Sequence, residues 1–315
     1  MFIQDLTPLH IQERRSIMGN MLKDRTAVIT GAGNGLGKAH ALAMAAQGAR
    51  VVVNDIGTSA NGDGESNNPA DLVARMIKDK GGEAVANYDS VATEEGAGNI
   101  IRTAINKFGR IDILVNNAGI IRGNFIHKID TSDWDQMIKV HLYGTFYCTR
   151  EAVPFMIEQK YGRIINTSSH NGLGMKGGVA YSAAKEGITG FTRAVARDMA
   201  EFGVTCNVIR PIAAWRGAPF KIKEFEEKRP DDVAVLVVYL ASEEAGHINS
   251  CVFEVYNGHV GMFEEPPPVK GVIYKDGSFT PEDLARIMPQ TLTKDRTIDS
   301  LPDVLPFKLT IPGME

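Results

Sequence analysis

Residues 25 to 48, RTAVITGAGNGLGKAHALAMAAQG, contain the clearest evidence for the fold of this chain. Its first six residues have the length and apolar character of a buried strand, and its last part has a helical pattern. Between them lie Gly31, Gly35 and Gly37, which let the backbone turn tightly and approach a pyrophosphate at the helix N-terminus. The spacing Gly-x3-Gly-x-Gly departs from the Gly-x-Gly-x-x-Gly fingerprint, and a glycine turn can also be purely structural. A nucleotide site therefore needs a second feature.

That feature is the next apolar run, RVVVND at 50 to 55, which ends in Asp55, eighteen residues after Gly37. A carboxylate at this strand end can bind both ribose hydroxyls of NAD and would repel the additional phosphate of NADP. Ile56, Gly57 and Thr58 follow it and offer no arginine for that phosphate. The strand, turn, helix and second strand together predict an NAD site.

A second constellation lies in YSAAK at 181 to 185, with Ser168 and Ser169 just upstream. Tyr181 and Lys185 are four residues apart, so a helix would place both on one face. The lysine charge would then favour the ionised phenol, which makes the tyrosine usable as an acid or base. An upstream serine could hold the substrate oxygen. The alternative is an ordinary half-buried tyrosine with a solvated lysine beside it.

The rest of the chain alternates short apolar runs with longer helical patterns, which predicts an α/β fold with a doubly wound parallel sheet of Rossmann type. The runs are VVVN, AVANY, DILVN, RIINT and TCNVI. We expect an N-terminal arm at 1–20, one catalytic domain at 21–261 and a C-terminal extension at 262–315 with a short helix at 281–288. The extension has enough apolar side chains that we expect it to pack on the core or on a neighbouring subunit.

Composition excludes several classes of protein. The chain has 315 residues, 43% of them hydrophobic, and a net charge of −4 without basic runs, so nothing indicates nucleic-acid binding. No segment approaches the roughly 20 apolar residues needed to span a bilayer. Cys148, Cys206 and Cys251 show no disulfide or metal spacing, which fits a reducing, cytoplasmic location and a site without metal.

TGAGNGLG at 30–37, NNAG at 116–119, the serine pair and YSAAK together resemble the short-chain dehydrogenase/reductase family over roughly residues 20 to 260. Within it, the chain is similar to the (3R)-hydroxyacyl-CoA dehydrogenase domain of peroxisomal multifunctional enzyme type 2 and its bacterial stand-alone relatives. The segments that carry this likeness are VVVNDIG at 51–57, GGEAVANYDSV at 81–91, KYGRIINTSS at 160–169 and FEVYNGHVG at 253–261.

The resemblance implies functional residues. Those for the cofactor are Gly31, Asn34, Gly35, Leu36, Gly37, Asp55, Asp89, Ser90, Asn117, Ala118, Gly119, Tyr181, Lys185, Pro211 and Ile212. Those for catalysis are Ser169, Tyr181, Lys185 and His141, and those for the substrate are Ser169, Tyr181 and Trp215. For Asp89 the resemblance implies a contact with the adenine, but an aspartate that caps a strand end would look the same. A homodimer or homotetramer is also implied.

Three departures from the family pattern matter. His141, in KVHLYG, stands where many members have asparagine, and a structural imidazole and a proton relay both stay open. Pro211-Ile212 replaces the usual Pro-Gly after the sixth strand. Counting back thirteen residues from Tyr181 gives Ser168, whereas aligning GRIINTSS from the strand gives Ser169. We choose Ser169, because strand position fixes which side a side chain faces and loop length varies more easily.

The sequence thus predicts an NAD-dependent oxidoreductase that interconverts a secondary alcohol and a ketone. By resemblance the first candidate substrate is a (3R)-hydroxyacyl-CoA-like thioester, and a hydroxysteroid or a terpene or other cyclic alcohol is the alternative. A regulatory protein that binds NAD without turnover is a different-class alternative. Trp215 and Phe220, in AAWRGAPFKIKEF, are expected to line the substrate entrance, where the charges offset one another and do not establish a CoA site.

Overall fold

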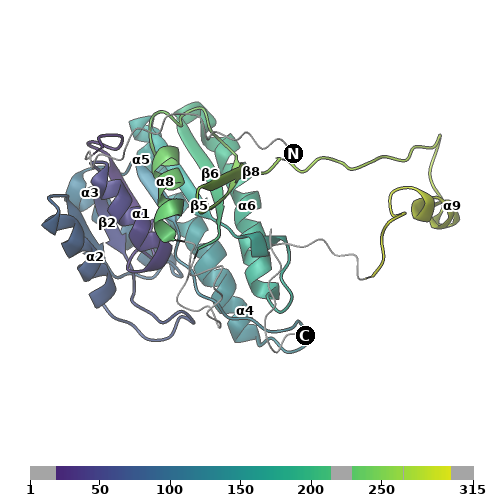
Figure 1. Ribbon diagram of the computed structural model, residues 1–315, viewed down its shortest axis with the longest axis horizontal. Helices are drawn as coiled ribbons and strands as arrows, with labels where there is room; N and C mark the ends of the chain where they lie inside the picture. Colours follow the sequence, from purple (N-terminus) through teal and green to yellow (C-terminus); the bar gives the residue numbers. More distant parts are fainter. Residues whose placement is uncertain (1–18, 214–228, 265, 299–315) are drawn as a thin grey trace.

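The computed structural model describes residues 19–213, 229–264 and 266–298, and it contains one eight-stranded sheet with helices on both faces (Figure 1). The order of the strands is β3-β2-β1-β4-β5-β6-β7-β8. Seven strands are parallel, and only β8 runs antiparallel, against β7. The predicted doubly wound α/β fold is confirmed.

The strands are short and mostly buried, as the apolar runs predict. They are β1 (Thr26–Thr30), β2 (Arg50–Asn54), β3 (Ala84–Asn87), β4 (Ile113–Asn116), β5 (Gly162–Thr167), β6 (Val204–Pro211), β7 (Val252–Tyr256) and β8 (His259–Met262). Arg110 and Asp112, which precede β4, belong to a polar cluster described below. β1 and β4 are neighbours although β2 and β3 lie between them in sequence, so the chain reverses its direction of winding beside β1. Ligands of such sheets bind at this switch point, outside the carboxyl ends of the strands.

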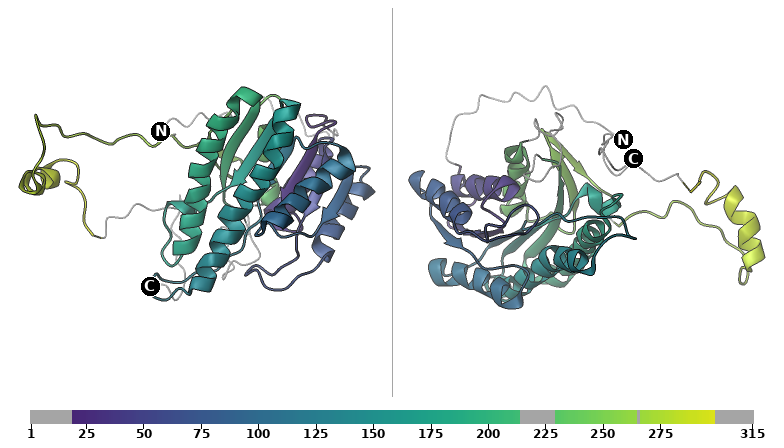
Figure 2. Two further views of the ribbon diagram at one scale, coloured as in Figure 1. Left: turned by 180° about the vertical axis from the view of Figure 1, so that it is seen from behind. Right: turned by 90° about the horizontal axis from the view of Figure 1, so that it is seen from below.

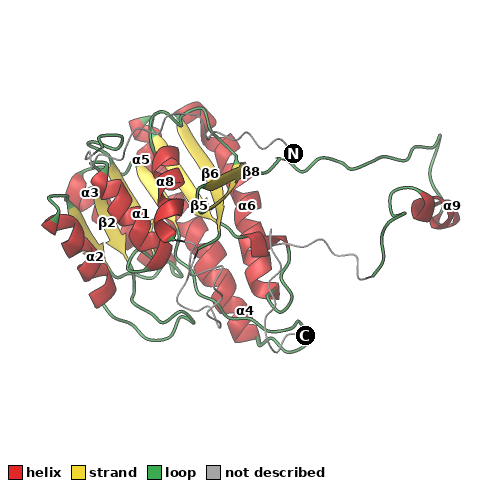
Figure 3. Ribbon diagram, in the orientation of Figure 1, coloured by secondary structure: helices red, strands yellow, loops and turns green. Residues whose placement is uncertain are grey.

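The helices form two layers (Figures 2 and 3). One layer contains α1 (Gly35–Ala46), α2 (Asn68–Asp79) and α8 (Pro230–Ala241); the other contains α3 (Glu94–Phe108), α5 (Gly144–Gln159) and α6 (Val179–Met199). A smaller cluster joins α6 to α4 (Thr131–Met137), which continues as a π-helix over Ile138–Tyr143. None of the helices in the described residues is long and apolar enough to cross a membrane.

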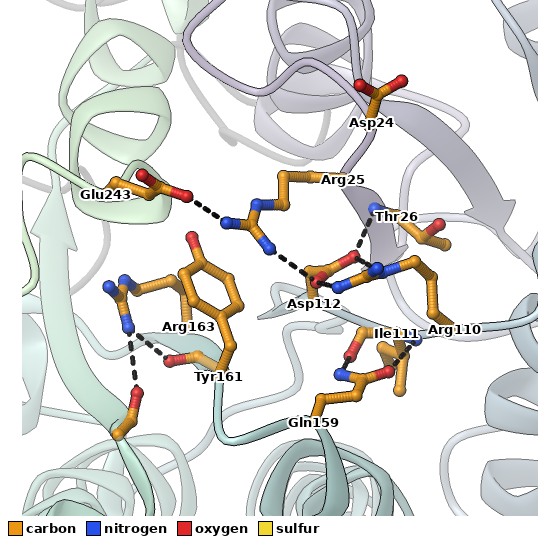
Figure 4. Close-up of polar contacts among 12 residues, drawn as sticks. Asp24, Arg25, Thr26, Arg110, Ile111, Asp112, Gln159, Tyr161, Arg163 and Glu243 are labelled. Carbon is orange, nitrogen blue, oxygen red and sulfur yellow. Dashed lines mark hydrogen bonds and ion pairs between the residues drawn. The ribbon is translucent and has the colours of Figure 1, made fainter.

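A buried polar cluster closes the amino edge of the sheet (Figure 4). The fully buried carboxylate of Asp112 accepts hydrogen bonds from the backbone N–H of Thr26 (2.9 Å) and from the guanidinium groups of Arg25 (3.2 Å) and Arg110 (2.6 Å). Arg25 also pairs with Glu243 beyond α8. These hydrogen bonds and ion pairs offset the free-energy cost of burying the Asp112 carboxylate. It ties β1 to the start of β4 at the edge opposite the candidate site.

The C-terminal extension leaves β8 and runs away from the body of the domain to α9 (Pro281–Ile287), the predicted short helix (Figure 1). Its apolar side chains are exposed: Val269 has 78%, Val272 80% and Tyr274 85% of its surface accessible. Phe263, at the start of the extension, packs on the domain beside His170, but the described residues after it do not cover the core of their own chain. Packing on a neighbouring subunit stays a prediction.

Candidate active site

The turn between β1 and α1 has the geometry that a pyrophosphate site requires. Gly31 and Gly35 have positive φ values of +63° and +51°, which side chains with a Cβ rarely adopt. A Cβ on Gly37 would lie 2.2 Å from the carbonyl oxygen of Gly31, so only glycine fits there. Asn34 is the N-cap residue of α1, and Leu36 lies in the first turn of that helix. The three glycines are thus needed by this backbone, and the turn presents free amides at a helix N-terminus.

Asp55 lies directly after β2 and is already held in place. One carboxylate oxygen accepts the backbone N–H of Gly33 and the other accepts that of Gly57, both at 2.7 Å. The carboxylate therefore contacts the glycine turn from the neighbouring strand. This is the position from which it could reach the ribose of a dinucleotide whose pyrophosphate rests on the turn.

The NNAG segment after β4 supports the turn from the other side. Asn117 donates its side-chain amide to the carbonyl oxygens of Thr30 (2.9 Å) and Gly31 (3.1 Å), and the backbone N–H of Ala118 donates to the Thr30 hydroxyl. A Cβ on Gly119 would lie 2.6 Å from the His141 ring. These residues fix the relative positions of β1, β4 and the helix that carries His141.

Asp89 and Ser90 lie after β3, at the same edge of the sheet. The Asp89 carboxylate accepts hydrogen bonds from the side-chain amides of Asn87 (2.8 Å) and Asn99 (2.9 Å). The Ser90 hydroxyl accepts the backbone N–H of Ala92. The Asp89 carboxylate thus joins the end of β3 to α3, and its contact with the adenine stays a prediction.

Tyr181 and Lys185 lie on one face of α6, as their spacing predicts. The Lys185 Nζ is 5.6 Å from the centre of the Tyr181 ring and donates to the Thr167 carbonyl oxygen at 2.7 Å. Burial lowers the pKa of Lys185 from 10.5 to about 7. Burial also raises the pKa of Tyr181, and a hydrogen bond with Ser169 offsets only part of this. This differs from the expectation that Lys185 lowers the tyrosine pKa, because desolvation of the phenol is the largest effect.

The two serines face different partners. Ser169 faces Tyr181, and its hydroxyl lowers the pKa of that phenol, against the effect of burial. Ser168 is buried and donates its hydroxyl to the backbone carbonyl oxygen of Lys185 at 2.8 Å, which holds β5 against α6. The geometry therefore brings Ser169, Tyr181 and Lys185 together, and it gives Ser168 a structural contact.

His141 lies inside the π-helix, and its ring meets the Tyr181 ring edge-on with 5.4 Å between centres. Its Nε2 is 2.8 Å from the Ile120 carbonyl oxygen, and its Nδ1 has no hydrogen-bond partner among the described residues. Burial and the charge of Lys185 lower the pKa of His141 from 6.5 to about 3, so the imidazole is neutral. The sequence did not indicate the π-helix, a feature that is frequent at functional sites.

Pro211 ends β6, and the backbone N–H of Ile212 donates to the Val255 carbonyl oxygen at 3.1 Å. Ile212 is buried at the carboxyl edge of the sheet, beside the other candidate residues. Trp215 and Phe220, predicted to line the substrate entrance, lie outside the described residues.

Sequence reasoning missed Arg122. This side chain donates to the Asn61 carbonyl oxygen (2.8 Å) and forms ion pairs with Asp63 (2.9 Å) and Asp133 (3.0 Å). Asn61 and Asp63 belong to the loop after β2, whereas Arg122 follows β4, and β1 lies between these strands. The loop thus crosses the carboxyl end of β1, above the glycine turn. Its polar composition showed only that it lies at the surface.

These features agree with what known proteins show. The profile of the short chain dehydrogenase family matches residues 25–214. The chain belongs to this family. A short-chain type dehydrogenase/reductase of Mycobacterium tuberculosis is 43% identical to it over 264 residues, which cover 80% of this chain and 92% of that protein. A crystal structure of a short chain dehydrogenase from Mycobacterium avium superposes with a TM-score of 0.78 at 39% identity, covering 88% of this chain and 97% of the other.

Two further relatives are a longer multifunctional enzyme and a subunit of another dehydrogenase. Peroxisomal multifunctional enzyme type 2 of Drosophila melanogaster is 49% identical over 222 residues, or 70% of this chain, and the match spans only 37% of that enzyme. The (2S)-[(R)-hydroxy(phenyl)methyl]succinyl-CoA dehydrogenase subunit BbsD of Thauera aromatica is 38% identical over 75% of this chain and 97% of the subunit. The sequence-based likeness to the multifunctional enzymes is thereby confirmed. The chain is an oxidoreductase of the type that acts on alcohols and ketones.

Proposed function

We propose that this protein is an NAD-dependent dehydrogenase of secondary alcohols, with a (3R)-hydroxyacyl-CoA-like thioester as its substrate. The observation that carries the reaction type is the grouping of Ser169, Tyr181 and Lys185 at the carboxyl ends of the strands. The observation that supports NAD is the Asp55 carboxylate held at the glycine turn.

The residues present fit a nicotinamide dinucleotide. The glycine turn would hold the pyrophosphate, Asp55 the adenine ribose, and Lys185 the ribose next to the nicotinamide. When bound, NAD supplies the hydride acceptor, and the protein supplies position and proton transfer. Asp89, Ser90, Asn117, Ala118, Gly119, Pro211 and Ile212 complete the proposed cofactor site.

In the oxidation direction, Tyr181 removes the proton of the substrate hydroxyl while Ser169 hydrogen-bonds the same oxygen. Burial raises the pKa of Tyr181, so the phenolate needs a positive charge nearby, and Lys185 is the cation beside its ring. His141 touches Tyr181 as a neutral imidazole whose Nδ1 is an open acceptor. We propose a proton relay for this imidazole, because it lies against the proposed base.

Two observations support a thioester substrate. The segments of this chain that resemble the multifunctional enzyme type 2 extend through most of the domain, and a relative that matches over nearly its full length is named for a hydroxyl-bearing CoA thioester. Trp215 is proposed to contact this substrate. By the family resemblance we propose a homodimer or homotetramer. The spacing of Cys148, Cys206 and Cys251, which suits a reducing compartment, is our reason for proposing a cytoplasmic location.

A substrate panel tests the proposal. The purified protein is mixed with NAD and, in separate reactions, with (3R)- and (3S)-3-hydroxybutyryl-CoA, a 3-hydroxysteroid and a cyclic alcohol, and NADH formation is followed at 340 nm. We expect the (3R)-thioester to give the highest kcat/KM. Faster turnover of a steroid or cyclic alcohol would contradict the substrate, and NADH binding without turnover of any alcohol would indicate a regulatory protein.

A further inference from the structure

Ser169 stands at the start of a short 3-10 turn, His170–Leu173, and the conformation of this turn decides where its hydroxyl lies. The Ser169 hydroxyl accepts the backbone N–H of Asn171 at 3.1 Å, so the side chain and the turn are fixed together. On one side α6 holds the turn: the Ser182 hydroxyl donates to the Asn171 carbonyl oxygen at 2.6 Å. Ser182 directly follows Tyr181, so this contact links the turn to the proposed base.

The other side of the turn is held from β7, 84 residues later in the sequence. The Nε2 of the buried His170 lies 2.8 Å from one carboxylate oxygen of Glu254, and the Nε2 of His259, on β8, lies 2.6 Å from the other. An ionised carboxylate only accepts hydrogen bonds, so both imidazoles donate their Nε2–H to it. Hydrogen bonds to a charged acceptor are about twice as strong as neutral ones.

The surroundings of Glu254 and His170 favour an ionised carboxylate and a neutral imidazole. Burial raises the pKa of Glu254, but the hydrogen bonds from His259 and His170 outweigh it, and the net pKa is lowered. Burial lowers the pKa of His170 and outweighs the hydrogen bond and the charge of Glu254, which raise it; Arg210 on β6 and His259 add smaller contributions that lower it. Near neutral pH a neutral His170 therefore donates to a charged Glu254. The Phe263 ring packs on His170 with 5.8 Å between ring centres.

We propose that Glu254 is a positioning residue for Ser169, acting through His170. Ser182 on α6 and Glu254 on β7 each form a hydrogen bond with the turn. Removing either bond leaves the turn held by a side chain on one side only. The proposal rests on the proposed function in one respect, namely that Ser169 holds the reacting oxygen. Its first test needs no turnover and is independent of that function.

The first test is hydrogen exchange of the turn in the full chain. The backbone N–H groups of Gly172 and Gly174 bond within the turn and report its opening. Losing a hydrogen bond to a charged group should lower their protection about 10- to 100-fold in Glu254→Ala. The matched control is His259→Ala. It removes the hydrogen bond between His259 and Glu254 but keeps the one between His170 and Glu254. Glu254→Gln, whose amide oxygen can still accept from His170, should retain most of the protection.

The second test is kinetic. Glu254→Ala should lower kcat about tenfold or more, since small misplacements at a reacting centre are costly, and should leave the Kd of NADH, measured by fluorescence, unchanged. Glu254→Gln should rescue most of the loss, and His259→Ala should behave like the unmodified protein. In a Ser169→Ala background, Glu254→Ala should cause no further loss, because it acts only through that serine.

Additive losses in the double variant, or unchanged protection of the turn in Glu254→Ala, would overturn the proposal. Failure of the proposed function would look different. Ser169→Ala would then keep full turnover, while the exchange experiment would still show whether Glu254 holds the turn.

Discussion

Acid should destabilise this protein through two buried histidines, His40 and His141. Burial lowers the pKa of each from 6.5 to about 3. Between about pH 3 and pH 6.5 each histidine is therefore neutral in the folded state and protonated in the unfolded state. The unfolded state binds more protons in this window, so stability is fully present above pH 6.5 and is lost as the pH falls.

The magnitude follows from the two pKa values. Lowering the pH from 7 to 5 should cost about 2 kcal/mol for each histidine, and about 4 kcal/mol for both. That is a large part of the roughly 5–15 kcal/mol by which native proteins are stable. His40 is the cleaner probe, because it lies on α1, is fully buried, and has no hydrogen-bond partner on either ring nitrogen among the described residues.

Urea unfolding at pH 7, 6 and 5, followed by circular dichroism, measures this loss. His40→Leu removes one titrating group with a side chain of similar size, so the difference between pH 7 and pH 5 should shrink by about 2 kcal/mol. Substituting the exposed His247 by alanine is the matched control and should leave the difference unchanged. If His40→Leu and the unmodified protein lost the same stability, the reasoning on buried imidazoles would be refuted.

Three further predictions concern the cofactor and the extension. Initial rates should be higher with NAD than with NADP, because Asp55 lies where the 2′-phosphate would be; equal rates would contradict this. Arg122→Ala should release the loop over the glycine turn and speed NADH dissociation about tenfold or more in stopped-flow fluorescence, since it removes two ion pairs and a hydrogen bond; an unchanged rate would show that the loop does not retain the cofactor. Deleting 264–315 should lower the melting temperature or change the oligomer and raise the substrate KM, with NAD binding least affected; unchanged assembly, stability and kinetics would make the extension a loose appendage.

The parts of the site that could be predicted are those formed by residues close together in the sequence. A strand, a glycine turn and a helix occupy consecutive residues, so the turn is readable from 25–48. The spacing of Tyr181 and Lys185 fixes their common helix face. The choice of Ser169 over Ser168 rested on strand register, and the structure places Ser169 against Tyr181.

The parts that could not be predicted depend on distant residues or on burial. Glu254, on the seventh strand, hydrogen-bonds His170 in the turn after Ser169, and Arg122 joins the loops that follow two different strands. In both cases the partners are far apart in the sequence, and their separation matches no known motif. The pKa of Tyr181 was expected to fall because its neighbour is a lysine, yet it rises because desolvation of the phenol is the larger effect. Only the three-dimensional structure shows how deeply that phenol is buried.

The central claim is that Tyr181 exchanges the proton of an alcohol whose hydride goes to NAD. It is tested most directly by comparing NADH formation from (3R)-3-hydroxybutyryl-CoA by the unmodified protein and by Tyr181→Phe, together with the Kd of NADH for each. Loss of a general acid or base should lower kcat about 10²- to 10⁴-fold and leave the Kd nearly unchanged. A Tyr181→Phe protein that turns over at a near-normal rate would contradict the account.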